Sequence, residues 1–189
     1  GGQVELSALA QGSNAVIFKA DGTDSYLDLP LLASFSGHVY YTNSGFYVSN
    51  AGTIHCPSLT SIQTANWSLD ATGVMDTAQV QSYSDGGGTL TVTGGRQLSL
   101  PGLTEMDYVG VTVSGGSVVE IPNVTSMAVV SNMLQATGVG SRLTLAGLTS
   151  ITGSTEYHGW SFVQAPSKAA RRMMARRASG RNSSTYITQ

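Results

Sequence analysis

A nine-residue phrase recurs seven times before residue 152, and this repetition constrains the fold more than any other feature of the chain. We number its positions slots one to nine. Four of them (one, three, six and nine) are apolar in nearly every copy. The copies begin at Val4, Leu27, Ile54, Met75, Leu98, Val119 and Leu143, in steps of 23, 27, 21, 23, 21 and 24 residues. The Met75 copy is the most divergent and is placed partly by its spacing.

Slots one and three are apolar on either side of a polar slot two, which is the two-residue periodicity of a β-strand. Proline then fills slot four in four copies and ends the strand, because it cannot donate to an inner ladder. A second alternating segment precedes most copies, and glycine-rich corners such as "SGG" join the segments. These further segments are residues 15–20, 45–49, 67–71, 89–95 and 111–116.

A unit of about 23 residues with short strands and no helix is typical of one coil of a β-solenoid. Equivalent slots of successive coils then stack ~4.8 Å apart, and the stack buries a core that one coil cannot bury alone. We therefore expect an all-β, right-handed parallel β-helix of about seven coils over residues 1–167. Slots one, three, six and nine would point inward. A leucine-rich horseshoe has a similar period, but it needs a helical segment where this chain alternates like a strand.

The composition agrees with many short strands, because only 11% of the residues are charged and 23 are glycine. Cys56 is the single cysteine, which excludes a disulfide framework, and no run of about 18 apolar residues predicts a membrane span. Charge is divided unevenly. The body before residue 168 has three basic and eleven acidic residues, a balance of −8. The chain opens inside a repeat, so we interpret it as a fragment of a longer protein.

The phrases "LSLPGLTEM", "VEIPNVTSM" and "LTLAGLTSI" make residues 1–167 resemble the β-helical repeats of large bacterial cell-surface and adhesin-like proteins. The chain is also similar to receptor L-domain-like repeats. The resemblance implies a β-helix and an extracellular or cell-surface location. It supplies no catalytic motif, so we expect a non-enzymatic structural or adhesive protein without a cofactor.

Slot two, which points outward, carries four carboxylates in seven copies: Glu5, Asp28, Asp76 and Glu120. They are typical of a solvated face that prevents aggregation. Alternatively, Glu5 and Asp28 on adjacent coils could share a cation through their oxygens. No EF-hand loop or nonapeptide calcium repeat is present, so we predict no metal site.

A second functional hypothesis is a polysaccharide-cleaving enzyme, either a lyase or a glycoside hydrolase, on the same β-helix. Such an enzyme needs carboxylates clustered on one groove, and Asp24, Asp28 and Asp76 would supply them if the coils bring them together. A lyase also needs a base, and Lys and Arg are scarce in the body. Cys56 falls in inward slot three and is expected to be a buried apolar residue. The three histidines, at 38, 55 and 158, have no ligand spacing and are expected at the surface.

Aromatic residues gather in "HVYYTNSGFY", inside the longest step of 27 residues. Aromatic rings can stack on sugars or anchor a protein partner, although alternating members must also fill the core. The candidates for binding a glycan or a protein are Tyr40, Tyr41, Phe46 and Tyr47.

The basic tail, residues 168–189, breaks the repeat, and its residues 168–178 favour a short helix. Its charge could bind an anionic lipid, polysaccharide or nucleic acid, whereas no nucleic acid is expected on the acidic body. It could also stay loosely ordered or cap the open end of the stack. Its basic residues are Lys168, Arg171, Arg172, Arg176, Arg177 and Arg181.

Overall fold

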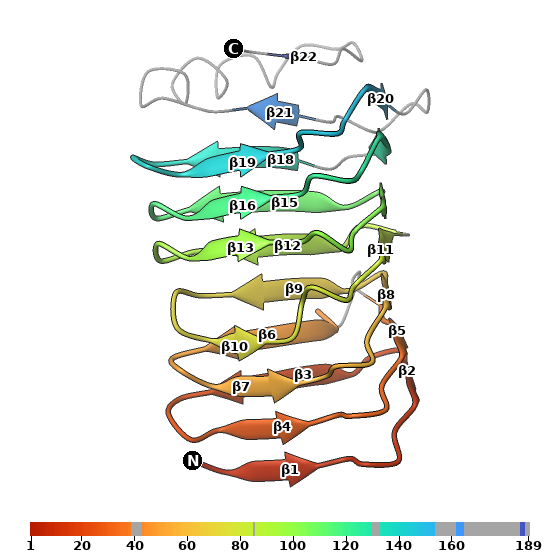
Figure 1. Ribbon diagram of the computed structural model, residues 1–189, viewed down its shortest axis with the longest axis vertical. Helices are drawn as coiled ribbons and strands as arrows, with labels where there is room; N and C mark the ends of the chain where they lie inside the picture. Colours follow the sequence, from red (N-terminus) through yellow and green to blue (C-terminus); the bar gives the residue numbers. More distant parts are fainter. Residues whose placement is uncertain (39–42, 85, 130–132, 154–161, 165–185, 188–189) are drawn as a thin grey trace.

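The computed structural model describes residues 1–38, 43–84, 86–129, 133–153, 162–164 and 186–187, and these form a β-solenoid of stacked parallel strands (Figure 1). In the part of the chain that carries the seven phrases, successive strands lie in turn on three sheet faces that we name A, B and C. The predicted all-β parallel solenoid is therefore confirmed. None of the described elements is a helix, so the described residues contain no helix long and apolar enough to span a membrane.

Face A contains the strands built around slots one and two. They end at slot two, or at slot one in β10, so each strand stops before the slot-four position that was predicted to end it. Seven strands occupy this face, matching the seven copies of the phrase. They are β1 (Gln3–Glu5), β4 (Tyr26–Asp28), β7 (Thr53–His55), β10 (Val74–Met75), β13 (Gln97–Ser99), β16 (Val118–Glu120) and β19 (Arg142–Thr144).

Face B follows after a turn at slots four to six, and its strands include slot nine. They are β2 (Gln11–Ser13), β5 (Ser34–Ser36), β8 (Ser61–Gln63), β11 (Ser82–Ser84), β14 (Glu105–Asp107), β17 (Ser126–Val129) and β20 (Ser150–Gly153). Face C contains the second alternating segment of each coil. Its strands are β3 (Ile17–Asp21), β6 (Gly45–Ser49), β9 (Asn66–Leu69), β12 (Thr89–Val92), β15 (Gly110–Ser114), β18 (Met133–Thr137), β21 (Phe162–Gln164) and β22 (Tyr186–Ile187).

The alignment of the phrases predicts the strand register correctly. In slot one, Leu27 pairs with Val4 below and Ile54 above, and Met75 pairs with Ile54, so even the most divergent copy is in register. Slot nine behaves in the same way on face B, where Ile62 pairs with Phe35 and Tyr83. Side chains with equal slot numbers therefore form continuous columns along the axis.

The inward columns form one apolar core that runs the length of the described coils. The largest side chains lie in its middle, where the rings of Trp67 and Tyr83 meet edge to face with centroids 5.9 Å apart. The buried Tyr83 hydroxyl donates to the Ala65 carbonyl at 2.7 Å, which satisfies its only polar atom. In the first coil Val4 is in register with the buried Leu27, as predicted, but it is 53% exposed. No described strand pairs below β1, so one side of this column is open.

Two ladders are interrupted although the coils continue. On face A, β10 does not pair with β13, and on face B, β14 does not pair with β17. The gap between β10 and β13 is visible in Figure 1. Face C continues past both interruptions from β3 to β22. Its last strand, Tyr186–Ile187, belongs to the predicted tail and pairs with β21, while residues 168–181 with all six basic side chains lie outside the described residues.

Candidate binding faces

The acidic row on face A consists of the outward slot-two residues, and the structure brings its first four members together. The register places Glu5 beside Asp28 and Asp28 beside His55. His55 Nδ1 lies 2.9 Å from Asp76 Oδ2. Glu120 lies farther along the row, with Oε1 3.3 Å from Nη2 of Arg142. The predicted outward direction of slot two is therefore confirmed for these residues.

The row creates a negative potential on this part of face A. Tyr26 lies on the same strand as Asp28, and the pKa of its hydroxyl is raised, first by partial burial and then by the charges of Asp28, Asp76 and Glu5. One oxygen of Asp28, Oδ1, is buried without a hydrogen-bond partner.

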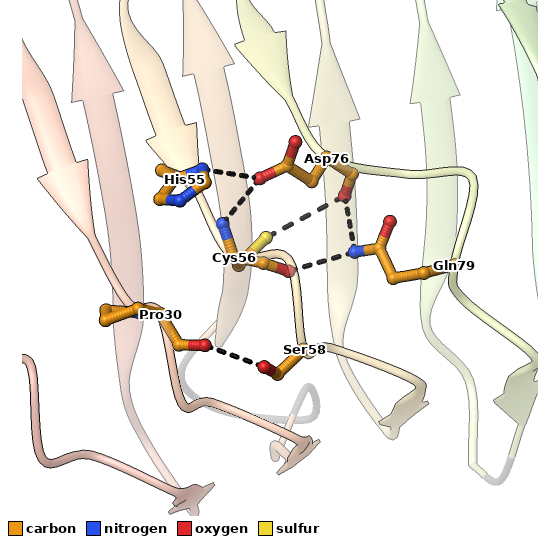
Figure 2. Close-up of polar contacts among 6 residues, drawn as sticks. All are labelled: Pro30, His55, Cys56, Ser58, Asp76 and Gln79. Carbon is orange, nitrogen blue, oxygen red and sulfur yellow. Dashed lines mark hydrogen bonds and ion pairs between the residues drawn. The ribbon is translucent and has the colours of Figure 1, made fainter.

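Asp76 has a structural role that its position in the repeat does not reveal (Figure 2). In four other coils the slot-three N–H donates to the slot-two carbonyl of the next coil, as Leu29 does to His55 at 2.8 Å. The Cys56 N–H instead donates to the Asp76 carboxylate, with Oδ2 at 2.9 Å. Gln79 Nε2 then donates to the carbonyls of Cys56 and Asp76, at 2.9 and 3.2 Å. The Asp76 side chain thus replaces a backbone acceptor where β10 is only two residues long.

Arg96 occupies the interruption between β10 and β13. Its Nη1 donates to the carbonyl oxygens of Gly73 and Asp70, the latter at 3.1 Å. Burial lowers the pKa of this guanidinium, and the nearby Asp70 partly opposes that shift. The arginine therefore supplies donors to carbonyls that no strand of the next coil reaches, because β13 does not pair there.

The corner between faces C and A holds two carboxylates engaged by donors. Burial raises the pKa of Asp70, but hydrogen bonds from the N–H groups of Asn50, Gly73 and Thr72, together with the Thr72 hydroxyl, lower it overall. Asp21 accepts from Asn50 Nδ2 and Ser49 Oγ, both at 2.8 Å. These bonds and the neighbouring lysine on β3 lower the pKa of Asp21 to about 2. Both carboxylates stabilise turns, so their acceptor capacity is largely used within the molecule.

Metal binding and thiol chemistry find little support among the described residues. No group of three His, Cys, Asp or Glu side chains there is arranged to hold a metal ion. Cys56 is fully buried as predicted, and desolvation, assisted by the charge of Asp76, raises the pKa of its thiol to about 12. A thiol in this environment is not a nucleophile.

The aromatic candidates separate into different environments. Tyr40 and Tyr41 lie outside the described residues. The prediction is wrong for Phe46, which is fully buried on β6 with its ring stacked on Phe18 at 5.1 Å, because its alternation places it on the core side of the strand. Tyr47 is half-buried on the outward side, and its hydroxyl donates to the Asn43 carbonyl at 2.6 Å.

A trough on face B is a further candidate binding site that the sequence did not lead us to predict. Its volume is about 390 Å³, and Gly12 and Phe35 form its floor. Two outward columns form its walls across β2, β5 and β8. One wall is Gln11, Ser34 and Ser61, and the other is Ser13, Ser36 and Gln63. The signal was present in slot eight, which is serine in five of seven copies: Gln11, Ser34, Ser61, Ser82, Glu105, Ser126 and Ser150.

The longest repeat step adjoins this trough. Its extra residues follow Ser36 at the end of β5, the middle strand of the trough. The buried Ser44 closes the base of this insertion, since its hydroxyl donates to the His38 carbonyl at 2.9 Å and accepts from the His38 N–H. The insertion and the trough thus lie on the same coils.

Comparison with known proteins identifies no relative: no family model matches the chain, and no significant match was found to a curated protein or to a solved structure. The resemblance to adhesin-like repeats therefore rests on the repeated phrase and the solenoid fold, and the chain is assigned to no family.

Proposed function

We propose that this protein is a rigid, non-catalytic β-solenoid that binds a partner at a cell surface or in the extracellular space, with the trough on face B as its binding face. The observation that carries the proposal is that most polar side chains on the walls of the trough are not used in hydrogen bonds within the described structure. The side chains of Gln11, Ser34, Ser36 and Gln63 make no hydrogen bond within the described part of the molecule. Polar atoms fixed on a rigid sheet are pre-organised to bond a partner.

Face A is less suited to binding, because some of its carboxylates already form hydrogen bonds or ion pairs within the molecule. Asp76 accepts the Cys56 N–H and contacts His55, and Glu120 contacts Arg142. A ligand that recruits these oxygens must first break internal bonds. Glu5 and Asp28 remain the outward carboxylates without such a contact.

Adhesion of coated beads tests the proposal. Beads carrying the 189-residue chain are washed over surfaces coated with plant, fungal or bacterial cell-wall material or with mucin. We expect retention on at least one surface, and no release of reducing ends or unsaturated sugars from it. Retention must fall at least tenfold for Ser34→Val/Gln63→Leu, which removes polar atoms from the trough. The control is Ser68→Val/Gln135→Leu, the same changes on the outward side of face C. Retention on no surface, or equal retention of both variants, contradicts the proposal.

Polysaccharide cleavage on face A is a second candidate, favoured by one observation. His55 is oriented by Asp76 and lies beside Asp28 in the register, so a base and a carboxyl group are adjacent. Incubation with neutral and acidic polysaccharides tests it. Turnover that disappears in His55→Gln would support the enzyme, and absence of products would remove it.

A further inference from the structure

We infer that the ligand of the trough on face B is a neutral, linear glycan that lies along the solenoid axis. This inference rests on the proposed function, because it names the partner class of the same site. It is argued from the charge, the apolar exposure and the spacing of the residues on that face.

The charge of the trough excludes an ionic ligand as the preferred partner. All six wall residues are serine or glutamine. The three basic residues of the body lie elsewhere, Lys19 on β3, Arg142 on β19 and Arg96 at a corner. Nothing on the walls can therefore neutralise an acidic polysaccharide, a phosphate or a nucleic acid, and no carboxylate there attracts a cation.

The apolar exposure of face B disfavours a protein partner. Protein interfaces are anchored by exposed aromatic or aliphatic side chains that become buried. Among the described residues, the large exposed hydrophobic side chains lie on faces A and C or at corners, and none lies within a strand of face B. Phe35 lines the floor but is 1% exposed, so its ring is not available as an anchor. β5 and β8 are also paired on both sides, so of the three strands of the trough only β2, at the edge of the sheet, could accept a peptide as an added strand.

The remaining chemistry fits sugar hydroxyls. Serine hydroxyls and glutamine amides each donate and accept, so they can bond hydroxyl groups in either direction. The paired walls repeat once per coil, at ~4.8 Å along the axis, and three coils provide a track of ~10 Å. A linear glycan also repeats its hydroxyls at a regular interval, so successive sugars can meet an equivalent pair of wall residues. Because the same pair of wall residues is repeated from strand to strand, an extended polymer can contact every pair, whereas a compact ligand can contact only one or two.

The track ends where the face changes. Ser82 Oγ donates to Ser61 Oγ at 3.0 Å, so the next coil begins to use its polar atoms internally. Beyond it, β14 places Glu105 and Asp107 in the same two columns. The neutral track therefore covers β2, β5 and β8, and we expect short oligosaccharides to saturate it.

Affinity electrophoresis and calorimetry test the inference with soluble probes. The neutral probes are cello-, xylo-, manno- and chito-oligosaccharides of two to six sugars, and the acidic probes are oligogalacturonates and oligoalginates. We expect at least one neutral series to bind, with affinity that rises with length and then levels off, and no acidic series to bind. Ser34→Val/Gln63→Leu should weaken binding at least tenfold, and Ser68→Val/Gln135→Leu should leave it within twofold. Circular dichroism confirms that both variants fold.

Three results would overturn the glycan assignment. They are binding of acidic probes only, binding of no probe, and neutral binding that the trough variant retains. If the coated beads still adhere to mucin or cell walls through face B while no oligosaccharide binds, the glycan assignment fails and the proposed function stands. If the beads adhere to nothing and no probe binds, both fail.

Discussion

Faces A and B are both built from stacked columns of equivalent slots, but their outward side chains differ in whether they bond within the molecule. Face A carries carboxylates and a histidine, the residues that most resemble a functional site, and Asp76 among them replaces a backbone acceptor. Face B carries serines and glutamines, which resemble inert surface, and several of them are unbonded around a trough. Where the face A ladder is interrupted after β10, the carboxylate of Asp76 is used to hold the fold together. Where the face B ladder is regular, across β2, β5 and β8, neutral side chains keep polar atoms that can bond a ligand.

The largest expected effect tests whether the two faces share one core. Ile54→Ala beneath face A and Ile62→Ala beneath face B should each lower the free energy of unfolding by about 2–5 kcal/mol, because both side chains are fully buried. Urea denaturation measures the change. A loss below about 1 kcal/mol for only one of the two would show that the faces are not packed alike.

Removal of the Asp76 carboxylate should have the next largest effect. Asp76→Ala leaves the Cys56 N–H without its acceptor, so we expect a loss of about 1–3 kcal/mol in the free energy of unfolding. Glu5→Ala is the control, since this slot-two carboxylate makes no hydrogen bond in the described structure, and its change should stay within about 0.5 kcal/mol. Equal effects of the two substitutions would remove the structural role of Asp76.

Acid should destabilise the corner between faces C and A. The pKa values of Asp21, at about 2, and of Asp70 are below the value of about 3.9 expected in the unfolded chain. A lowered folded-state pKa contributes stability that is full above about pH 4 and is lost as the pH falls through the folded-state value. Melting temperatures between pH 6 and pH 2 should therefore fall, and Asp70→Asn should flatten this decline. Asp24→Asn, which removes an exposed carboxylate without a hydrogen bond, should not, and an unchanged slope in Asp70→Asn would contradict the assignment.

The smallest expected effect on stability belongs to face B. Ser34→Val/Gln63→Leu removes no internal hydrogen bond, and valine suits a strand, so the free energy of unfolding should change by no more than about 0.5 kcal/mol. Chemical denaturation of this variant beside Ser68→Val/Gln135→Leu checks it. A loss above about 1 kcal/mol would mean that the walls of the trough hold the fold together rather than await a ligand.

The fold could be predicted from the sequence because one phrase specifies one coil. Slots one and nine fix the register even at Met75 and Gly12, since a shift by one residue would turn apolar side chains outward. The role of Asp76 could not be predicted in this way. That role depends on β10 ending after two residues, which the sequence pattern does not show. From the pattern, slot two predicts only that the Asp76 carboxylate points outward.

The trough on face B was not predicted for a related reason. Attention to charged and aromatic residues led to slot two and to the insertion, and it assigned Phe46 to the surface although its strand alternation places it in the core. The serines of slot eight form a column as regular as the leucines of slot six. A trough arises only when that column is placed beside Ser13, Ser36 and Gln63, which requires the strand register and the two-residue spacing of the walls.

Amide chemical-shift mapping tests the central contrast between the faces most directly. The labelled chain is titrated with the neutral oligosaccharide that binds best, and shifts are followed on both faces. The account predicts perturbations at β2, β5 and β8, centred on Ser34, Ser36 and Ser61, with little change at Asp28, His55 and Asp76. Perturbations centred on the acidic row of face A, with the trough unaffected, would contradict it.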